Sequence, residues 1–251
     1  MISSIVAMNL DQYLSDTDLH VTDQTIAIFS DYLFLLQKFN QRAGFTSLAD
    51  DDEIVKRHFI ESIALLVSLQ GVGVISDSEL LNVVDIGPGG GFPSLPMAIM
   101  DSRLQLNLVE SNRKRAHYLE QIVGELQSHG ILTNTNIINA RAEDAGRMDF
   151  FREDHDLVVS RAVAPLNVLV EYALPMLRDG GIFASVKGSR VHQEVTDARN
   201  ALEQLGGQLV TVTDLPLIST LYQQSVVIVE KKGQIDDRYP RRAGVPVRRP
   251  L

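Results

Sequence analysis

Cysteine is absent from this chain of 251 residues. Its absence excludes disulfide bonds, zinc sites with thiolate ligands and cysteine nucleophiles. Long apolar runs are missing as well, because no stretch approaches the roughly 20 apolar residues that a membrane-spanning helix needs. The first residues, Met1 to Leu10, lack the basic region and the long apolar core of a signal peptide. We therefore expect a cytoplasmic protein without a membrane partner.

Two familiar kinds of catalytic site also lack their sequence patterns. The six histidines are scattered, and none forms a His-x-x-x-His pair of metal ligands. The Gly-x-Ser-x-Gly motif of serine hydrolases does not occur. An acidic run, Asp50 to Glu53, is better explained by the electrostatics of a helix start than by metal binding. The sequence therefore predicts neither a metal site nor a Ser-His-Asp triad.

Positive charge is scarce over the chain as a whole but not at its end. The net charge is −9 and the isoelectric point is about 5.1, so the molecule is not a general nucleic-acid binder. From Lys231 to Leu251, however, seven Lys or Arg residues stand against two Asp. We expect this proline-containing tail to lie over the domain without regular structure. It is either a patch that faces phosphates or simply a solvated tail.

A glycine-rich stretch organises the rest of the chain. Val83–Ile86 is a short apolar run that predicts a buried strand, and Leu95–Met100 has the composition of a helix start. Between them lies a turn with spaced glycines, at Gly87, Gly89 and Gly91. A strand, a glycine turn and a helix in this order are typical of the nucleotide-binding loop of a doubly wound α/β fold. The alternative is a tight turn with a purely structural role.

The spacing of the glycines narrows the choice of ligand. A dinucleotide fingerprint needs a third small residue at position 92, where this chain has Phe92. The pattern therefore favours S-adenosylmethionine over a nicotinamide cofactor. Glu110 ends the next predicted strand, 23 residues after Gly87. An acid at about this distance accepts hydrogen bonds from ribose hydroxyls in doubly wound folds, although it could also be an ordinary charge at a strand end.

Strands and helices alternate from residue 82 to residue 232, which indicates a mostly parallel sheet. The predicted strands are Asn82–Ile86, Leu104–Glu110, Thr135–Asn139, Asp156–Ser160, Gly181–Lys187, Gln208–Thr213 and Gln224–Glu230. The predicted helices are Lys114–Glu125, Pro165–Leu177 and His192–Leu205. A short link around Leu215–Leu221 joins the last two strands. Seven such strands suit the methyltransferase version of the fold, in which the last strand runs antiparallel.

The first 80 residues read as helices that pack on the domain formed by residues 81–251. One helix should begin at Thr22 and end at Gly44, since Phe29, Tyr32, Leu33, Leu36 and Phe39 recur at helical spacing. A second should begin at Asp50, where Glu53 three residues later suggests a capping box. It should end at Gly71 and carry an Arg57–Glu61 ion pair on its surface.

Residues after two further strands are candidates for ligand binding. Ala142 and Glu143 follow the third strand, where an adenine amino group would lie. Arg161 follows the fourth strand and could contact the methionine carboxylate, contact the substrate or pair with an acid. The carboxyl ends of parallel strands meet at the edge of the sheet where ligands bind. We therefore expect these residues to share one site.

Several motifs together resemble the glucose-inhibited division protein B family, the methyltransferases of 16S ribosomal RNA. The matching segments are Phe39-Asn40 through Phe45-Thr46, Arg57 to Ser62, Asp85 to Pro93, Glu110 to Arg115, Ser160 to Leu166, Lys187-Gly188, Tyr239 to Pro246 and Pro250-Leu251. The chain departs from the family pattern at Phe39, Gly44, Glu61, Pro88 and Ser94, where the family usually has Trp, Asn, Asp, Thr or Ser, and Gly. The resemblance covers nearly the whole chain.

The resemblance implies a class I, Rossmann-like methyltransferase that transfers a methyl group from S-adenosylmethionine to N7 of a guanine in 16S ribosomal RNA. The cofactor residues that the loop and the resemblance indicate are Gly87, Gly89, Gly91, Phe92, Glu110, Ser111, Asn112, Ala142, Glu143 and Arg161. The residues that it suggests for RNA binding are Asn40, Arg57, His58, Lys187, Arg241 and Arg242. The expected partner is 16S ribosomal RNA or the small ribosomal subunit, and the expected state is a monomer.

Two other functions stay open at this point. A small-molecule methyltransferase would have the same fold, but the basic tail and Arg113-Lys114-Arg115 argue against it. A non-enzymatic binding protein could also use this fold, since a fold does not determine a function. The intact cofactor residues argue against that second alternative.

Overall fold

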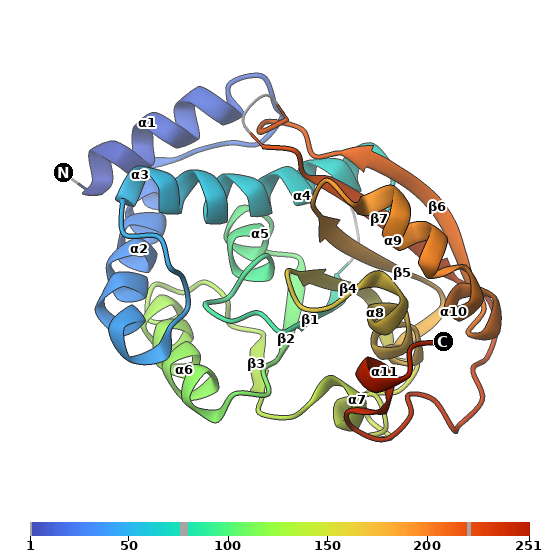
Figure 1. Ribbon diagram of the computed structural model, residues 1–251. Helices are drawn as coiled ribbons and strands as arrows, with labels where there is room; N and C mark the ends of the chain where they lie inside the picture. The colour runs from blue at the N-terminus through green and yellow to red at the C-terminus, as the bar shows by residue number, and fades with distance from the viewer. Residues whose placement is uncertain (1, 76–79, 220–221) are drawn as a thin grey trace.

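A computed structural model describes residues 2–75, 80–219 and 222–251 of the chain. Its centre is a seven-stranded sheet in the order β3-β2-β1-β4-β5-β7-β6 (Figure 1). The strands are β1 Leu81–Ile86, β2 Leu104–Val109, β3 Thr135–Ile138, β4 His155–Arg161, β5 Leu177–Lys187, β6 Gly207–Asp214 and β7 Ser225–Lys231. Each strand overlaps one that the sequence predicts.

The directions of the strands decide where a ligand can bind. Strands β1 to β5 run parallel to one another, whereas β7 is antiparallel to both β5 and β6. The predicted antiparallel last strand is thus confirmed. Ile86 pairs with both Val109 and Ser160, so β1, β2 and β4 reach the same edge of the sheet together. The loops that carry the candidate ligand-binding residues therefore all emerge at that edge.

Helices cover both faces of the sheet (Figure 1). Those on the first face are α1 Ile2–Leu14, α2 Asp23–Ala43, α3 Asp51–Ile54, a π-helical turn Val55–Ile60, α4 Glu61–Gly71, α5 Ser94–Met100 and α6 Arg113–Gln127. Those on the second face are α7 Ala142–Ala145, α8 Leu166–Ala173, a 3-10 turn Leu174–Met176, α9 Val191–Asp197, α10 Arg199–Gln204 and α11 Val245–Arg248. Among the described residues, no helix is both long and apolar enough to cross a membrane.

Alternate residues along the strands point to opposite faces of the sheet and belong to two hydrophobic layers, one on each face. Val83 and Leu157 belong to the layer under α1 to α6, while their neighbours Val84 and Val158 belong to the layer under α7 to α11. This division follows from the two-residue period of side chains along a strand. Because both faces of β1 and β4 are covered, consecutive apolar residues stand at their centres, Val83-Val84 in β1 and Leu157-Val158-Val159 in β4.

The predicted helix ends at Thr22, Gly44 and Asp50 are confirmed. The Thr22 hydroxyl caps α2, and Gly44 ends it in the left-handed conformation at φ 66°. Asp50 accepts a hydrogen bond from the backbone N–H of Glu53 at 3.0 Å, which caps α3. The capping box itself is incomplete, because the Glu53 carboxylate accepts from the hydroxyl of Tyr222 at 3.2 Å.

Three other local predictions differ from the structure. The predicted helix His192–Leu205 is divided into α9 and α10, and the tail contains the short helix α11. The surface pair of Arg57 and Glu61 is wrong, since Glu61 is buried and pairs with Arg161. The predicted link around Leu215–Leu221 lies partly outside the described residues. One error concerns a pair of residues far apart in the sequence, and the other two concern where short helices begin and end.

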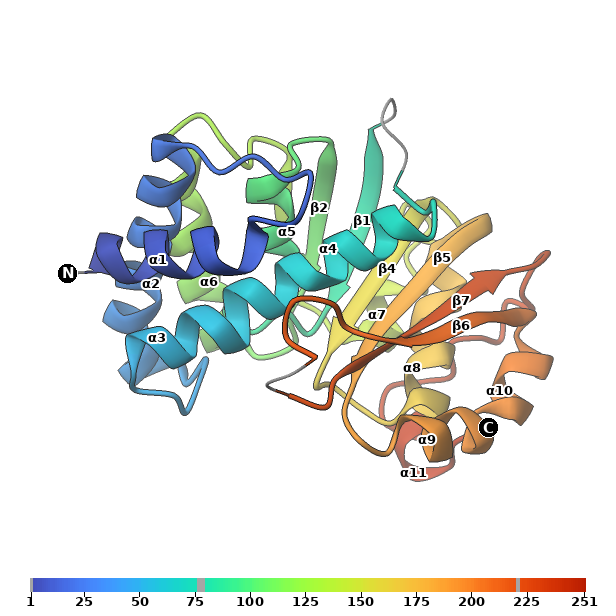
Figure 2. The same ribbon diagram turned by 90° about the horizontal axis from the view of Figure 1, so that it is seen from above.

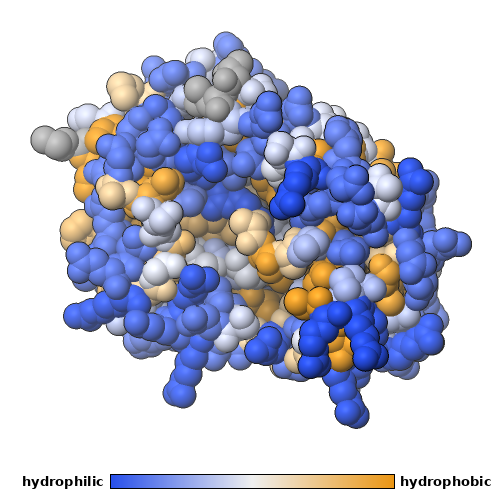
Figure 3. All heavy atoms as spheres, in the orientation of Figure 1, coloured by the Kyte–Doolittle hydropathy of each residue, from blue (hydrophilic) through white to orange (hydrophobic). Residues whose placement is uncertain are grey.

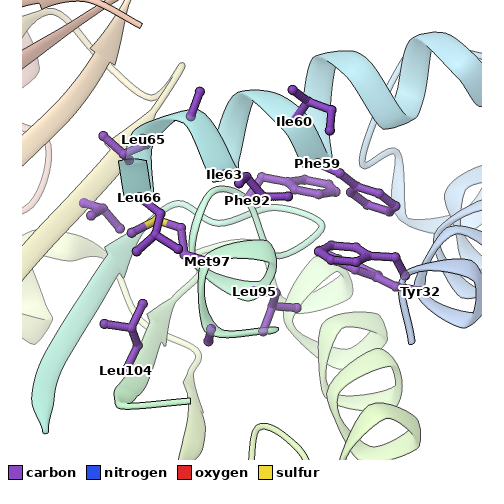
Figure 4. Packing of buried hydrophobic residues seen from close by; sticks show 14 of the residues in the cluster. Tyr32, Phe59, Ile60, Ile63, Leu65, Leu66, Phe92, Leu95, Met97 and Leu104 are labelled. Atoms are coloured by element: carbon purple, nitrogen blue, oxygen red, sulfur yellow. The ribbon is translucent and has the colours of Figure 1, made fainter. Parts of the chain in front are cut away.

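The N-terminal helices pack on the glycine-rich turn as well as on the sheet. Figure 2 shows α3, the π-helical turn and α4 as one rod that crosses the sheet. Tyr32 stacks on Phe59 at 5.1 Å and on Phe92 at 5.5 Å between ring centroids (Figure 4). Its hydroxyl donates to the carbonyl of Gly90 at 2.7 Å. Helix α2 thereby holds the turn in place, whereas the division into residues 1–80 and 81–251 stays a prediction.

This packing predicts that a chain starting at Leu80 will aggregate. One hydrophobic cluster contains side chains of α1, α2 and α4 together with side chains of β1, β2 and α5. Removing the N-terminal helices would expose the second set to water, at about 25 cal/mol for each Å² of apolar surface. Size-exclusion chromatography with light scattering would show aggregates, with the full-length chain as control. A soluble monomeric fragment that binds S-adenosylmethionine normally would contradict the packing argument.

Candidate active site

The glycine turn after β1 shows why its glycines are needed. Gly87 and Gly91 have φ values of 70° and 106°, in the region that favours glycine. A Cβ atom at Gly87 would lie 2.8 Å from Val163, and one at Gly91 would lie 2.6 Å from the hydroxyl of Tyr32. A Cβ atom at Gly89, in contrast, would meet nothing within 4 Å. The backbone at Gly89 thus borders open space that a ligand can approach.

Glu110, after β2, fastens this turn from the side. One of its carboxylate oxygens accepts from the N–H of Gly89 at 3.2 Å, and the other from the N–H of Asn112 at 2.7 Å. The Asn112 side chain in turn caps α6. A carboxylate has about four acceptor positions, so Glu110 can still accept from a ribose hydroxyl. Its buried carboxylate therefore shapes the cofactor loop whether or not it touches a ligand.

We expect Glu110→Ala to weaken S-adenosylmethionine binding by about 1–3 kcal/mol, because two backbone amides and the ribose lose an acceptor. Titration calorimetry with S-adenosylhomocysteine measures the effect. Glu120→Ala is the matched control, since Glu120 is exposed on α6. An unchanged affinity in Glu110→Ala would show that the turn holds its shape without this carboxylate.

Four of the predicted cofactor residues line one small cavity of about 170 Å³: Gly87, Ser111, Ala142 and Glu143. Its other walls are mostly apolar and come from Ile86, Val109, Ala140, Arg141, Val163, Ala164, Tyr172 and Val247. An apolar cavity of about 150 Å³ holds one benzene ring, so this cavity has room for a flat aromatic group. Apolar walls with one carboxylate fit an adenine base, which has two faces to bury and an amino group that donates.

A larger cleft of about 830 Å³ adjoins this cavity and shares Val163 and Ala164 with it. Four predicted residues line the cleft: Arg57, His58, Lys187 and Arg161. Figure 3 shows that the face seen in Figure 1 is hollowed near its centre. The sequence therefore predicted members of two adjoining pockets, and the structure places Arg161 in the larger one, with the residues predicted for RNA binding.

Arg161 connects the end of β4 to the N-terminal rod. Its guanidinium donates to the carbonyl of Arg57 at 2.8 Å, to Glu61 at 3.1 Å and to Nδ1 of His58 at 2.9 Å. It also lies 5.1 Å from the centre of the Phe92 ring. Of the three roles that the sequence left open for Arg161, the structure shows the pairing with an acid.

His58 is neutral in this network. Burial and the nearby charge of Arg161 lower its pKa to about 3. Because Arg161 donates to Nδ1, the ring proton is on Nε2, which donates to the hydroxyl of Thr46 at 2.8 Å. Asn40 holds the same residue, since it donates to the Thr46 carbonyl at 2.8 Å and accepts from the Thr46 N–H at 3.0 Å. His58 and Asn40 therefore fix a loop of the cleft wall.

Lys187 and Arg57 both line the cleft, but their side chains are held by different contacts. The Lys187 ammonium donates to the Ala164 carbonyl at 2.7 Å and pairs with Glu194 at 2.8 Å, while burial lowers its pKa. The Arg57 guanidinium lies 4.2 Å from the centre of the Tyr222 ring. Lys187 thus braces the wall, and Arg57 rests on an aromatic face at the cleft.

The two predicted tail arginines differ from each other. Arg241 binds Glu171 with Nε at 2.8 Å and Nη2 at 2.6 Å, so its guanidinium points inward rather than toward phosphates. Arg242 is exposed. The larger cleft is lined by neither residue. Only Arg242 therefore keeps the exposure that RNA binding would need.

Sequence reasoning missed several residues of the cleft wall. They are Phe45, Ser47, Leu48, Glu53, Ala162, Pro165, Val186, Gly188, Arg190 and Gln224, together with Glu61 and Glu194. Gln224 directly precedes β7, and because β7 is antiparallel, its beginning lies at the same edge as the ends of the parallel strands. That signal was available, whereas Glu194 on α9 offers none.

The sequence comparisons are decisive for the family. A family profile described as rRNA small subunit methyltransferase G (GidB) matches residues 25–219. The chain belongs to this family. The ribosomal RNA small subunit methyltransferase G of Carboxydothermus hydrogenoformans is 38% identical over 96% of this chain and 98% of its own. The protein of that name from Desulfitobacterium hafniense is 36% identical over 93% of this chain and 92% of its own.

Solved structures agree on the fold. A predicted O-methyltransferase from Agrobacterium tumefaciens has a TM-score of 0.52 at 16% identity, covering 68% of this chain and 81% of its own. An S-adenosylmethionine-dependent O-methyltransferase from Thermotoga maritima has a TM-score of 0.51 at 17% identity, over 74% and 72%. The predicted family and the class I methyltransferase fold are confirmed. The protein belongs to a family of ribosomal RNA methyltransferases.

Proposed function

We propose that this enzyme methylates N7 of one guanine in 16S ribosomal RNA. The observation that carries the proposal is the contact between the two pockets, because Val163 and Ala164 line both. A nucleoside in the small cavity and a base in the larger cleft would meet at this shared wall. The relatives that share most of this chain are named as methyltransferases of small-subunit ribosomal RNA.

The chemistry of N7 suits the side chains present. N7 of guanine has an in-plane lone pair and no proton, so its attack on a methyl group needs no general base, unlike attack by a hydroxyl. S-adenosylmethionine supplies the methyl group on a positively charged sulfur. Both ring nitrogens of His58 are engaged, and its pKa of about 3 keeps it from taking a proton near neutral pH. The residues of the site therefore align the reactants and exclude water.

The acids of the cleft have a place in this reaction. Methylation at N7 leaves a positive charge on the guanine base, which nearby carboxylates stabilise. Glu61 and Glu194 both line the cleft, and each is paired with one cation, Arg161 or Lys187. These pairs hold the carboxylates in place before the charge develops. Their oxygens are thus oriented for the positive charge that moves from the sulfonium sulfur to the base during the transfer.

RNA contacts would surround the mouth of the cleft. A guanine must leave its stack to reach a pocket, and aromatic rings or arginine planes commonly receive such a base. Arg57 on Tyr222 offers such a plane, and exposed Arg190 can bind phosphate. The partner that we propose is 16S ribosomal RNA or the small subunit, met by a monomeric enzyme in the cytoplasm.

Methylation assays with a labelled methyl donor test this function. Small ribosomal subunits and protein-free 16S ribosomal RNA from cells lacking the enzyme would be the substrates. Nucleoside mass spectrometry should find one new N7-methylguanosine, and fragment mapping should place it at one position. Label on a ribose oxygen or an exocyclic amine would overturn the N7 assignment. Label on small molecules without RNA would favour a small-molecule methyltransferase of the same fold.

A further inference from the structure

The C-terminal segment, residues 241–248, lies against the smaller cavity. Val247 is one of the lining side chains, although 60% of its surface is exposed. Figure 1 shows α11, which contains Val247, beside α7 and α8. A Cβ atom at Gly146 would lie 3.1 Å from the ring of Pro240, so the approach to this segment is also tightly packed. The segment thus forms a wall rather than a loose end.

Two anchors hold the segment in this position. Arg241 binds both carboxylate oxygens of Glu171, a residue of α8 with no exposed surface. The N–H of Gly244 donates to Oε1 of Glu143 at 2.8 Å. A bidentate pair fixes the position and the orientation of the arginine at once. Both anchors attach the tail to elements that border the cavity.

The second anchor, the hydrogen bond from Gly244, orients the Glu143 carboxylate, which the sequence analysis places near adenine. Glu143 is only 4% exposed, and its Oε1 also accepts from the hydroxyl of Tyr172 at 3.2 Å. Among the described residues, none is seen to donate to Oε2. Glu143 lines the cavity, and both of its observed donors are at Oε1. Oε2 of Glu143 is therefore suited to accept from a donor on a bound ligand.

We infer that the C-terminal segment completes the adenine end of the S-adenosylmethionine pocket. Val247 covers one face of the adenine, and Gly244 orients Glu143 so that Oε2 accepts from the amino group. The inference rests on one part of the proposed function, the use of S-adenosylmethionine as the methyl donor, and does not depend on which RNA atom is methylated. It gives the basic tail a cofactor-binding role in addition to any contact with RNA.

Val247→Asp in the full-length protein tests the wall. A carboxylate there would face an apolar base and stand near Glu143, so both solvation and charge oppose binding. We expect Kd to rise about tenfold for S-adenosylhomocysteine and equally for 5′-methylthioadenosine, which lacks the amino acid end. Calorimetry without RNA measures both. Val210→Asp is the matched control, since Val210 is 50% exposed on β6 and outside the cavity lining, and its Kd should not change.

The outcomes separate the possible errors. Equal Kd values for Val247→Asp and the unchanged protein would overturn the inference. A weaker Kd for S-adenosylhomocysteine alone would place the segment at the amino acid end and overturn the adenine assignment. Val247→Leu should restore binding, and a loss there would show that Val247→Asp acts through misfolding. If the unchanged protein bound neither ligand, both the assignment of S-adenosylmethionine as methyl donor and the role of the C-terminal segment would be wrong. If the methylated RNA atom were not N7, the proposed function would be wrong, but the role of the C-terminal segment in cofactor binding would stand.

Discussion

Arg161→Met is expected to abolish methyl transfer and to lower the free energy of unfolding by about 3–5 kcal/mol. Arg161 is the cation beside Glu61, and both side chains are largely buried. Removing the guanidinium leaves a carboxylate in a poorly solvated place, which is costlier than losing both partners. It also removes the donor to Nδ1 of His58 and thereby loosens the loop at Thr46. Urea denaturation and the labelled-methyl assay measure the two effects.

A double substitution separates stability from activity. Arg161→Met with Glu61→Met should recover part of the lost stability, because no lone charge remains, but should stay inactive. Arg178→Met is the control, since the Arg178 side chain is 54% exposed and its pair with Asp156 should contribute only about 0–1 kcal/mol. A stable and fully active Arg161→Met protein would show that this network neither supports the rod nor shapes the cleft.

The fold was predictable because its signals are local. Val83, Val84 and Ile86 are apolar neighbours that face both sides of the sheet, which identifies a strand covered on both faces, with Asp85 as its one polar residue. Thr22 and Gly44 act on the first and last turns of one helix, within a few residues of their positions. The glycines at 87 and 91 are required by backbone conformation and by close neighbours. Such signals depend on residues that are close together in the sequence, so they can be recognised before the fold is known.

The partners of charged side chains were not predictable in the same way. Glu61 was expected to pair with Arg57, four positions away, but it pairs with Arg161, 100 positions away. Glu53 fits a capping box by its spacing, yet Tyr222 binds it from 169 positions away. Burial decides these outcomes, since a buried charge needs a partner wherever the fold brings one. The candidate site was thus predictable in its residue types and location but not in its internal pairs.

The two tail arginines should respond in opposite ways to substitution. We expect Arg241→Ala to lower the free energy of unfolding by about 3–5 kcal/mol, because Glu171 is fully buried and would lose its cation. The released segment would also weaken S-adenosylhomocysteine binding. Arg242→Ala should leave both the stability and the cofactor affinity unchanged, since Arg242 is exposed. Thermal denaturation and calorimetry compare the two variants directly.

Arg242→Ala should instead affect the binding of RNA. If its guanidinium contacts a phosphate, Arg242→Ala should flatten the logarithmic salt dependence of RNA affinity by about 0.7–0.9 units. Methyl transfer would then fall through a higher KM for RNA at an unchanged kcat. An unchanged salt slope in Arg242→Ala would remove it from the RNA interface and leave Arg57 and Arg190 as the candidate contacts. A stable Arg241→Ala protein with normal cofactor affinity would show instead that the tail holds its place through Gly244 and Pro240. The pair must be changed one residue at a time, because a double variant would unfold the tail and hide any contact that Arg242 makes.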